Sequence, residues 1–580
     1  MNRGITLKDA FKTETFELGK IMAPEQTVGV FREKLAGVRL DILKETVRID
    51  NGRLDIPVYF SLCGRDAETA TGAKKQMGKG ASPSQAEASA VMELAERYSL
   101  FTFSSDPANF IRFPHEEVSG KAMGLDQIRL SVHDDSIDAS AALDLFSMTP
   151  VKWTAGVDLT TGDERLVPFD WFFALNEYNG SAAGNCIEEA VLQALCEVVE
   201  RHVSSVVSRS KMTVPIIDKA TVTDPVARGL LDKFEHAGIS VFLFDMSLNT
   251  GIATVGVIAY DPATFPGRSE IVWTAGTSPD PQKAVVRALT EAAQLGGDFN
   301  SGSSYVASGL PKPRALEDVE FLTGGETVVS IRSLPDLSDS NIRVEVEQCV
   351  QKLADQGLHA FVIDVTNPDL KIPAVYVVVP GAHFRERTSG TSVGMLTAKL
   401  IAGGDGADSA IPLLQEMNRR LPGKYYTRFF LGLTYLSIDE PGEALQHLRA
   451  ASDLDPAEQE LPTIYSYTGV CLKELERYRE ALEVLKKAEQ LDRERTDVYN
   501  LMGFCHFKLK EHEKAIECFK SVLALNPGSG IDYANIASNY RDMGKVEEAV
   551  QYYSLALELD PDLDFARENL VRLQGAENNG

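Results

Sequence analysis

The sequence lacks the markers of several protein classes. Its seven cysteines include no Cys-x-x-Cys pair, so neither a zinc site nor a disulfide framework is indicated. No run of about eighteen apolar residues occurs, which argues against a membrane-spanning helix. The opening MNRGITLKDAFKTETFELGK has no apolar core of the signal-peptide type. We therefore expect a cytoplasmic protein.

Basic residues are also scarce relative to acidic ones. The chain has 84 Asp and Glu but only 58 Lys and Arg, a formal net charge of −26. A nucleic-acid binder needs a basic footprint, and so does a protein that binds an anionic membrane. We expect neither partner, and an acidic protein fits a cationic or metal-bound ligand better. At 580 residues the chain should form two or three domains.

One helical pattern occurs three times, at 84–99, 188–203 and 281–294. Each copy has two alanines four positions apart, followed by Glu93, Glu197 or Glu291. Two copies continue with a second glutamate and an arginine, Glu96–Arg97 and Glu200–Arg201. Residues three apart lie on one face of a helix, so each of these two helices aims two carboxylates in one direction.

Paired carboxylates on converging helices repel one another. A divalent cation would resolve the repulsion, and oxygen ligands of this kind suit magnesium, which is commonly shared with nucleotide phosphates. Three ordinary amphipathic helices with solvated glutamates are the alternative for any helix taken singly. The repetition in register, with small residues beside the acidic face, favours the metal site.

Two compositional regimes divide the chain near residue 405. Before it, helical stretches alternate with β-rich runs at 56–63, 239–246, 253–260, 359–366 and 373–380. This alternation predicts an α+β domain over residues 1–405. The glycine-rich stretch 403–409 reads as a boundary, and 406–424 as a linker or helix.

Residues 425–575 repeat with a period near 34. The last unit, which ends at Pro561, shows the pattern with Tyr533, Ala537, Ala549 and Ala556. This spacing resembles tetratricopeptide repeats, and about four units predict an all-α superhelix whose concave face binds a peptide or protein. The alternative is an array that only stabilises the protein or dimerises it, so the sequence also allows a homodimer.

Three long motifs carry a second resemblance, to the YcaO family. They are GKGASPSQAEASAVMELAERYS (78–99), NGSAAGNCIEEAVLQALCEVVERH (179–202) and AGTSPDPQKAVVRALTEAAQ (275–294). The match extends from LGKIMAPEQTV (18–28) through DIPVYF (55–60) to IDVTNPDLKIPAVYVVVPG (363–381). The resemblance implies a YcaO-type ATP-binding domain of α+β fold in front of the repeats.

The resemblance implies ATP and Mg2+ as cofactors, bound by acidic helices instead of a phosphate-binding G-x-x-x-x-G-K-[ST] loop, which the chain does not contain. It implies an enzyme that activates a backbone amide of a peptide or protein substrate by phosphorylating the amide oxygen. By motif position, the magnesium ligands would be Glu93, Glu96, Glu197 and Glu200. The residues that hold the nucleotide would be Lys20, Thr27, Lys79, Ser82, Ser89, Asn185, Glu189, Gln193, Arg201, Arg287 and Glu291, with Glu189 and Glu291 contributing to metal or nucleotide.

The nucleophile and the catalytic residues stay open. The family includes enzymes of cyclodehydration and thioamidation, and accessory factors for methylthiolation of ribosomal protein S12. Azoline-forming members typically end in a proline-rich tail, whereas this sequence ends in QGAENNG. We therefore favour the other reactions of the family over azoline formation. A scaffold that binds nucleotide without turnover is a further alternative. For Arg201 the alternative to a phosphate contact is a salt bridge to a neighbouring glutamate, and Gly78 and Gly80 are read as residues that allow a turn.

Overall fold

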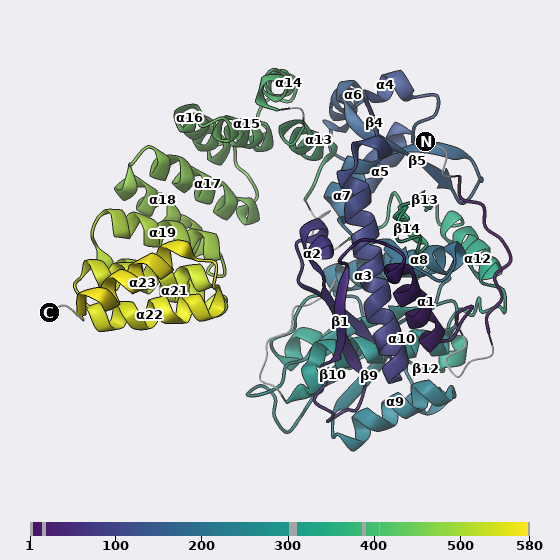
Figure 1. The fold of residues 1–580 in the computed structure, drawn as a ribbon. Coiled ribbons are helices and arrows are strands. Elements are labelled where there is room, and N and C mark those ends of the chain that lie inside the picture. Colours follow the sequence, from purple (N-terminus) through teal and green to yellow (C-terminus); the bar gives the residue numbers. More distant parts are fainter. Residues whose placement is uncertain (1–3, 14–18, 301–309, 385–389, 405, 578–580) are drawn as a thin grey trace. The chain divides into compact units, whose positions relative to one another are not determined.

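The structure is a computed structural model that describes residues 4–13, 19–300, 310–384, 390–404 and 406–577 (Figure 1). The chain forms two compact units. The first comprises Met1–Ala139 and Phe146–Val393, and the second, called the repeat unit below, comprises Ser140–Leu145 and Gly394–Gly580. Across the part of the chain that the structure describes, no helix combines the length and the apolar character needed to cross a membrane.

Three sheets build the first unit. Two of them are a three-stranded antiparallel sheet in the order β1-β2-β3 and a five-stranded sheet in the order β11-β10-β9-β8-β12. The third has the order β4-β5-β13-β14-β7, with β6 paired to β5. The strands are β1 Leu43–Arg48, β2 Val58–Cys63, β3 Lys75–Lys79, β4 Ile111–Phe113, β5 Val151–Asp158, β6 Glu164–Pro168, β7 Ser181–Ala183, β8 Ile216–Ile217, β9 Ser240–Asp245, β10 Thr254–Tyr260, β11 Val272–Thr277, β12 Val328–Val329, β13 Phe361–Asp364 and β14 Ala374–Val378.

Helices precede, connect and follow these strands, and one of them, α6, contributes Ser140–Leu145 to the repeat unit. They are α1 Pro24–Ala36, α2 Arg65–Thr71, α3 Pro83–Ser105, α4 His115–Val118, α5 Leu125–Ser131, α6 Ala139–Met148, α7 Phe169–Asn176, α8 Ile187–Ser210, α9 Pro225–His236, α10 Pro281–Gly296, α11 Glu320–Thr323 and α12 Ile342–Ala354. Helix α8 lies between two sheets, because its buried residue Val199 shares a core with Val377 of β14 and Trp273 of β11. Helices α9 and α10 cover the other face of the five-stranded sheet, with Val241 and Val257 in their core.

Helices α3, α8 and α10 each follow a strand that approaches them closely. A Cβ atom on Gly78 of β3 would lie 2.0 Å from the backbone nitrogen of Ala90, and one on Gly276 of β11 would lie 2.5 Å from that of Ala288. The alanines of the repeated pattern are fully buried at these contacts. Gly78 and Gly80 therefore do more than allow a turn: they admit the helix backbone closely, since a Cβ atom on Gly80 would lie 2.6 Å from the backbone nitrogen of Ala86.

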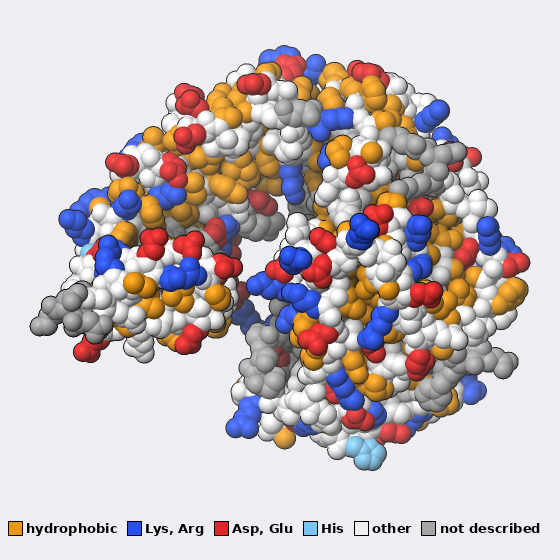
Figure 2. Space-filling view, viewed as in Figure 1, with side chains coloured by type: hydrophobic (Ala, Val, Ile, Leu, Met, Phe, Trp, Pro, Cys, Tyr) orange, Lys and Arg blue, Asp and Glu red, His pale blue; other side chains and the backbone are white. Residues whose placement is uncertain are grey.

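The repeat unit stacks helix pairs. Its helices are α13 Val393–Ala402, α14 Ala407–Arg420, α15 Tyr425–Ser437, α16 Pro441–Ser452, α17 Leu461–Glu474, α18 Tyr478–Leu491, α19 Thr496–Lys508, α20 His512–Leu525, α21 Gly530–Asp542, α22 Val546–Leu559 and α23 Asp564–Glu577. Gly432, Gly469 and Gly503 meet Leu448, Leu485 and Phe519 where the two helices of a pair cross. Figure 2 shows acidic and basic side chains interspersed over the visible face of this unit.

The predicted fold class is confirmed: an α+β domain precedes an all-α repeat array. All three predicted acidic helices form, and each ends beyond the pattern, at Ser105, Ser210 and Gly296. The five predicted β-rich runs correspond to β2, β9, β10, β13 and β14. A short 3-10 helix, Glu458–Glu460, lies between α16 and α17.

Candidate functional site

Two helices carry a shared acidic face. Helix α3 begins at Pro83, with Ser82 as N-cap accepting a hydrogen bond from the backbone of Gln85. Helix α8 begins at Ile187 directly after β7. Both helices contact β7 and β14, so they lie beside the same two strands of the six-stranded sheet. Glu93 and Glu96 come from α3, and Glu197 and Glu200 from α8; we call these four residues the glutamate quartet.

An arginine from the same helix contacts each pair of glutamates. Arg97 Nη2 lies 2.6 Å from Glu93 Oε1, and Arg97 Nη1 lies 2.8 Å from Glu96 Oε1. On α8 the distances are longer: Arg201 Nη2 lies 3.7 Å from Glu197 Oε1, and Arg201 Nη1 lies 3.9 Å from Glu200 Oε1. The site thus combines acidic and basic groups instead of presenting bare carboxylates.

The quartet is mostly buried and its members influence one another across the two helices. Burial raises the pKa of Glu96 well above its usual value, and the Glu93 and Glu197 carboxylates raise that pKa further, against the effect of Arg97. Burial also raises the pKa of Glu197; Arg201 and Arg97 lower it, while Glu93 and Glu200 add to the rise. The four carboxylates therefore form one electrostatic cluster.

In the structure the carboxylates of the quartet contact Arg97 and Arg201 and do not converge on a shared central point. No group of three or more His, Cys, Asp or Glu side chains in the described ranges has the arrangement of a metal site. A cation between the helices would require Glu93 and Glu197 to turn from Arg97 and Arg201, with which they pair at i,i+4 spacing. The structure thus brings the predicted magnesium ligands together without itself presenting a finished coordination shell.

Two supporting residues were not identified from the sequence. The Ser181 hydroxyl of β7 lies 2.6 Å from Glu96 Oε1, to which it donates, and 3.3 Å from Arg97 Nη1, from which it accepts. The Arg97 guanidinium lies 3.9 Å from the centre of the Tyr178 ring, within cation–π range. These contacts join a helix to a turn far along the chain, so only the recurrence of Glu-Arg in both motifs pointed towards Arg97.

Basic side chains adjoin the quartet from the third helix and the first sheet. Lys79 of β3 contacts the Glu291 carboxylate of α10. Burial lowers the pKa of Lys79 to about 8; Glu200 opposes the shift, and Arg287 and Arg201 add to it. Arg287 Nη1 donates to Gln193 Oε1 at 2.6 Å, while its Nε is buried and meets no acceptor among the described groups. Lys79, Gln193, Arg287 and Glu291 thus adjoin the quartet.

A second group lies at the start of α8. Glu189 is 2% exposed, and its carboxylate accepts from the backbone of Ile21 at 2.6 Å and from both nitrogens of Asn185 at 3.0 Å. Lys20 Nζ lies 4.0 Å from Glu189 Oε2 and is half exposed. Glu189 therefore anchors the N-terminal segment to α8, with Lys20 and Asn185 around it.

The remaining three predicted site residues are hydroxyl groups. Thr27 is buried in α1, and its hydroxyl donates to the Ala23 carbonyl at 3.3 Å. Ser82 caps α3, and its oxygen accepts from the backbone of Gln85 at 3.3 Å. Ser89 is partly exposed in α3, on the face of Glu93 and Glu96. Thr27 and Ser82 thus have structural hydrogen bonds, and Ser89 faces the site.

The donors present fit a magnesium nucleotide. Four carboxylates offer the oxygen ligands that magnesium takes, and the raised pKa values of Glu96 and Glu197 show carboxylates that a cation would help to keep ionised. Lys79 and the buried, unmatched Nε of Arg287 offer donors to phosphate oxygens. The site can therefore bind a cation through its carboxylates and a polyanion through its basic side chains.

Comparisons with known proteins agree with this geometry. Residues 77–383 match the family model described as YcaO cyclodehydratase, ATP- and Mg2+-binding. Residues 496–529 and 533–563 match tetratricopeptide repeat models. Helices α19, α20 and α22 fall within these two ranges and α21 overlaps the second, so the repeats recognised in the sequence are confirmed there.

Individual relatives cover parts of the chain. An uncharacterized protein of Methanothermobacter thermautotrophicus is 30% identical over 378 residues, 62% of this chain and 93% of that protein. The ribosomal protein S12 methylthiotransferase accessory factor YcaO of Escherichia coli is 28% identical over 303 residues, 49% of this chain and 50% of that protein.

A solved heterocyclase, in complex with substrate and cofactor, has a similar fold. Its TM-score is 0.52 at 22% identity, and the match covers 66% of this chain and 55% of the heterocyclase chain. The family model alone spans more than half of the 580 residues and contains all three acidic helices. This chain therefore belongs to the YcaO family.

Proposed function

We propose that this chain is an ATP- and Mg2+-dependent enzyme that activates a backbone amide of a peptide or protein substrate for post-translational modification. The observation that carries the proposal is the glutamate quartet on α3 and α8, flanked by Lys79, Arg201 and Arg287. Family membership supports the same activity, because the family is described as an ATP- and Mg2+-binding cyclodehydratase. Cyclodehydration and thioamidation both include such an activation, after a nucleophile has added to the carbonyl carbon, and the proposal covers either.

Each part of the site has a role in this proposal. When bound, ATP and magnesium supply a phosphoryl group for the amide oxygen, which turns a poor leaving group into a feasible one. Phosphoryl transfer depends mainly on positioning and charge neutralisation. The quartet would hold the cation, Arg287 and Lys79 would offer donors to phosphate oxygens, and Glu291 keeps Lys79 in place. Ser181 and Tyr178 fix Arg97 and, through it, the α3 carboxylates.

Binding of magnesium-ATP by calorimetry tests the proposal. The change Glu197→Gln removes a charge from the quartet while nearly keeping its shape. We expect it to weaken binding by one to two powers of ten, about 1.4 to 2.8 kcal/mol. The matched control is Glu87→Gln on α3, where Glu87 pairs with Arg32 at 2.7 Å instead of joining the quartet. Equal binding by both variants, or no binding by the unchanged protein, would contradict the proposal.

A second candidate function is nucleotide binding without turnover, in a scaffold protein. The short contacts of Arg97 with Glu93 and Glu96 favour it, since one guanidinium already engages two of the four carboxylates. Release of phosphate from ATP in the presence of a substrate peptide separates the two functions. The resemblance to the Escherichia coli accessory factor adds a third setting, in which the same ATP use serves a partner methylthiotransferase.

We further propose that the repeat unit holds a peptide or protein segment. Helices α19 and α21 border a cavity of about 410 Å³ lined by Asn500, Phe504, Ile531, Asn535 and Arg541. Phe504 is 37% exposed and Ile531 is 44% exposed. Asparagine amides can donate to and accept from a peptide backbone, and the exposed apolar side chains can cover its apolar residues.

Comparative mass spectrometry in the source cells tests this role. Mass changes that vanish when the chromosomal copy carries Glu197→Gln identify the modified protein. Phe504→Glu should lower the modified fraction of that protein while magnesium-ATP binding stays unchanged. Leu525→Glu is the matched control, because Leu525 is 42% exposed on α20 and does not line the cavity. Equal modification by both variants would rule out this cavity.

A further inference from the structure

Strand β9 lies inside the five-stranded sheet but is only partly paired. On one side it pairs with β10 along its whole length, from Ser240 to Asp245. On the other side the neighbour is β8, which has two residues and pairs with β9 only between Ile216 and Phe244. The first half of β9 therefore has an open side in the described part of the sheet.

The backbone groups on this open side can be identified. The Asp245 amide donates to the Pro215 carbonyl, so Asp245 faces the β8 side. Backbone groups alternate along a strand, so Val241 and Leu243 face the same way. The Val241 carbonyl confirms the direction, because it accepts from Lys219 Nζ at 3.2 Å. On this side β8 reaches β9 only at Phe244, so the Val241 amide faces the open side of the described sheet.

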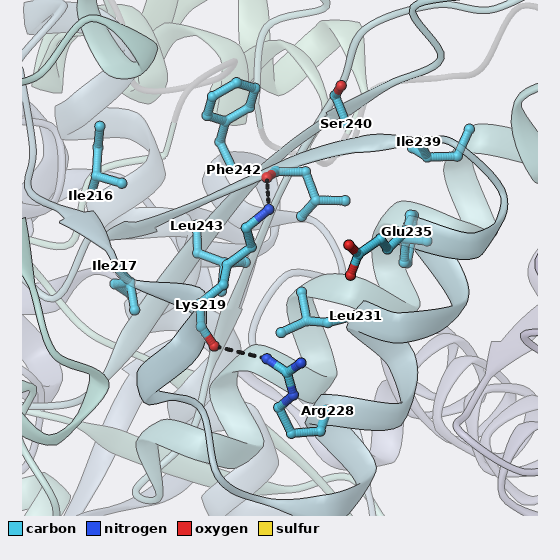
Figure 3. Close-up of a pocket in the computed structure, with 12 residues that line it drawn as sticks. Ile216, Ile217, Lys219, Arg228, Leu231, Glu235, Ile239, Ser240, Phe242 and Leu243 are labelled. Atoms are coloured by element: carbon cyan, nitrogen blue, oxygen red, sulfur yellow. Dashed lines mark hydrogen bonds between the residues drawn. The ribbon is translucent and has the colours of Figure 1, made fainter.

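A cavity of about 480 Å³ lies against this edge. Its apolar walls include Ile217 of β8, Leu231 of α9 and Leu243 of β9. Figure 3 shows Lys219, Leu231, Glu235 and Arg228 on one side of β9, with the Phe242 ring on the other. The volume and the apolar walls provide room for side chains of a chain segment beside the strand edge.

The charged side chains that line the cavity are Lys219, Arg228 and Glu235, and the two cations against one carboxylate favour a segment with an acidic residue. Lys219 donates to a carbonyl and makes no ion pair with a described carboxylate. Arg228 donates to the Lys219 carbonyl at 3.1 Å and lies 3.1 Å from Asp232. A lysine at an open edge can simply prevent strand pairing with other chains. Here the edge also adjoins a cavity that such protection does not require.

We infer that an extended segment of the peptide substrate binds this cavity as an added strand of β9. Its backbone would accept from the Val241 amide and replace Lys219 at the Val241 carbonyl. The displaced ammonium would then pair with an acidic side chain of the segment, and an apolar side chain would pack against Ile217 and Leu231. The inference rests on the proposed function only in naming the substrate as the source of the segment.

Hydrogen exchange of the full chain tests the inference directly, without nucleotide. The probe is a short capped peptide in which valine and threonine alternate between two terminal glutamates. The expected result is slower exchange of the Val241 amide, and of the other edge groups of β9, in the presence of the peptide. A peptide of the same sequence with N-methylated backbone amides should have no such effect, because it cannot pair as a strand. Unchanged exchange at millimolar peptide, or equal protection by the methylated peptide, would overturn the inference.

Two variants sharpen the test. Val241→Pro removes the open amide and should weaken binding of the probe about fivefold or more, the worth of one hydrogen bond. The unchanged protein should bind the glutamate-flanked peptide about two- to fivefold more tightly than a glutamine-flanked one. Lys219→Met should bind the two peptides equally. Binding unchanged in both variants would overturn the inference. If Val241→Pro does not fold, exchange in the unchanged protein still decides. Magnesium-ATP binding is measured separately, so failure at β9 is distinguishable from failure of the proposed function.

Discussion

Helices α3 and α8 carry the same two glutamates and the same arginine in register, yet their arginines are held differently. Arg97 makes contacts of 2.6 and 2.8 Å to its glutamates and lies on the Tyr178 ring. Arg201 stays 3.7 and 3.9 Å from its glutamates. One sequence pattern thus produces a tight arginine clamp on α3 and a looser arrangement on α8.

The difference assigns different tasks to the two arginines. Arg97 is fixed from three sides, by carboxylates, a hydroxyl and an aromatic ring, so we expect it to stabilise the fold and orient Glu96. The guanidinium of Arg201 is beyond hydrogen-bond distance of its glutamates. Because the ion pairs of Arg201 with Glu197 and Glu200 are longer than those of Arg97, exchanging them for a contact with a phosphate oxygen should cost less, and we expect α8 to be the helix that responds to nucleotide.

Removing Arg97 should have the largest effect on stability. Arg97→Met leaves Glu96, which is 7% exposed, without its opposite charge. Breaking a buried ion pair from one side typically costs about 3 to 5 kcal/mol, so we expect a loss of that order in denaturant unfolding. The double change Arg97→Met with Glu96→Gln should recover most of the loss. Arg201→Met should destabilise less, and equal losses for the two arginines would remove the distinction between them.

A change on β3 tests whether α3 packs more closely against its preceding strand than α8 does. At the same spacing before the first alanine of each helix, β3 has Gly78 and β7 has Ala182. Gly78→Ala gives β3 the residue that β7 has at this position. The added Cβ would lie 2.0 Å from the Ala90 backbone nitrogen. We expect destabilisation of about 1 to 3 kcal/mol from overpacking, measured by thermal unfolding.

The control for that change is a glycine with free space. Gly229 on α9 has no atom within 4 Å of an added Cβ. Gly229→Ala should therefore stabilise the protein by about 0.4 to 1 kcal/mol, the usual gain of replacing glycine in a helix. Stabilisation by both changes would mean that β3 and α3 separate easily, against the close packing of Gly78 on the Ala90 backbone.

Much of the fold and part of the site follow from local pattern. The spacing of Glu93 and Glu96, and of Glu197 and Glu200, predicts paired carboxylates on helices, and alanines beside them predict close packing. Both features depend only on helix geometry, and the helices form as expected. The repeats were equally accessible, because a fixed period repeats the same small residues at each helix crossing.

Contacts between distant segments could not be predicted in this way. Nothing local to Ser181 indicates that it meets Glu96, 85 positions away in the chain. Glu189 looks like part of the acidic motif, yet it accepts from the Ile21 amide of a remote segment. The roles assigned by motif position to Lys20, Thr27 and Ser82 remain predictions, since a hydroxyl or amine contact with a nucleotide depends on tertiary placement.

Removing the Ser181 hydroxyl should have a smaller effect than the changes at Arg97 or Gly78. Ser181→Ala takes from Glu96 a hydrogen bond of 2.6 Å but leaves Arg97 as its partner. A hydrogen bond to a charged group contributes about 1.5 kcal/mol, which is the loss in unfolding free energy that we expect. Ser205→Ala is the control, because the Ser205 hydroxyl on α8 is buried and has no acceptor or donor among the described groups. A larger loss in Ser205→Ala than in Ser181→Ala would contradict the support assigned to β7.

The smallest expected effect comes from changing the shape of the Arg201 side chain on α8. Arg201→Lys keeps the positive charge but replaces a planar fork with a single ammonium, so one donor to a phosphate is lost. We expect magnesium-ATP binding to weaken about fivefold, or about 1 kcal/mol, with unfolding nearly unchanged. Arg97→Lys should do the reverse, since its fork engages Glu93 and Glu96 at once. Arg228→Lys on α9, where the Arg228 side chain is 40% exposed, is the control for both. If instead Arg201→Lys lowers stability and spares binding, Arg201 is a salt-bridge residue like Arg97, and the two helices work alike.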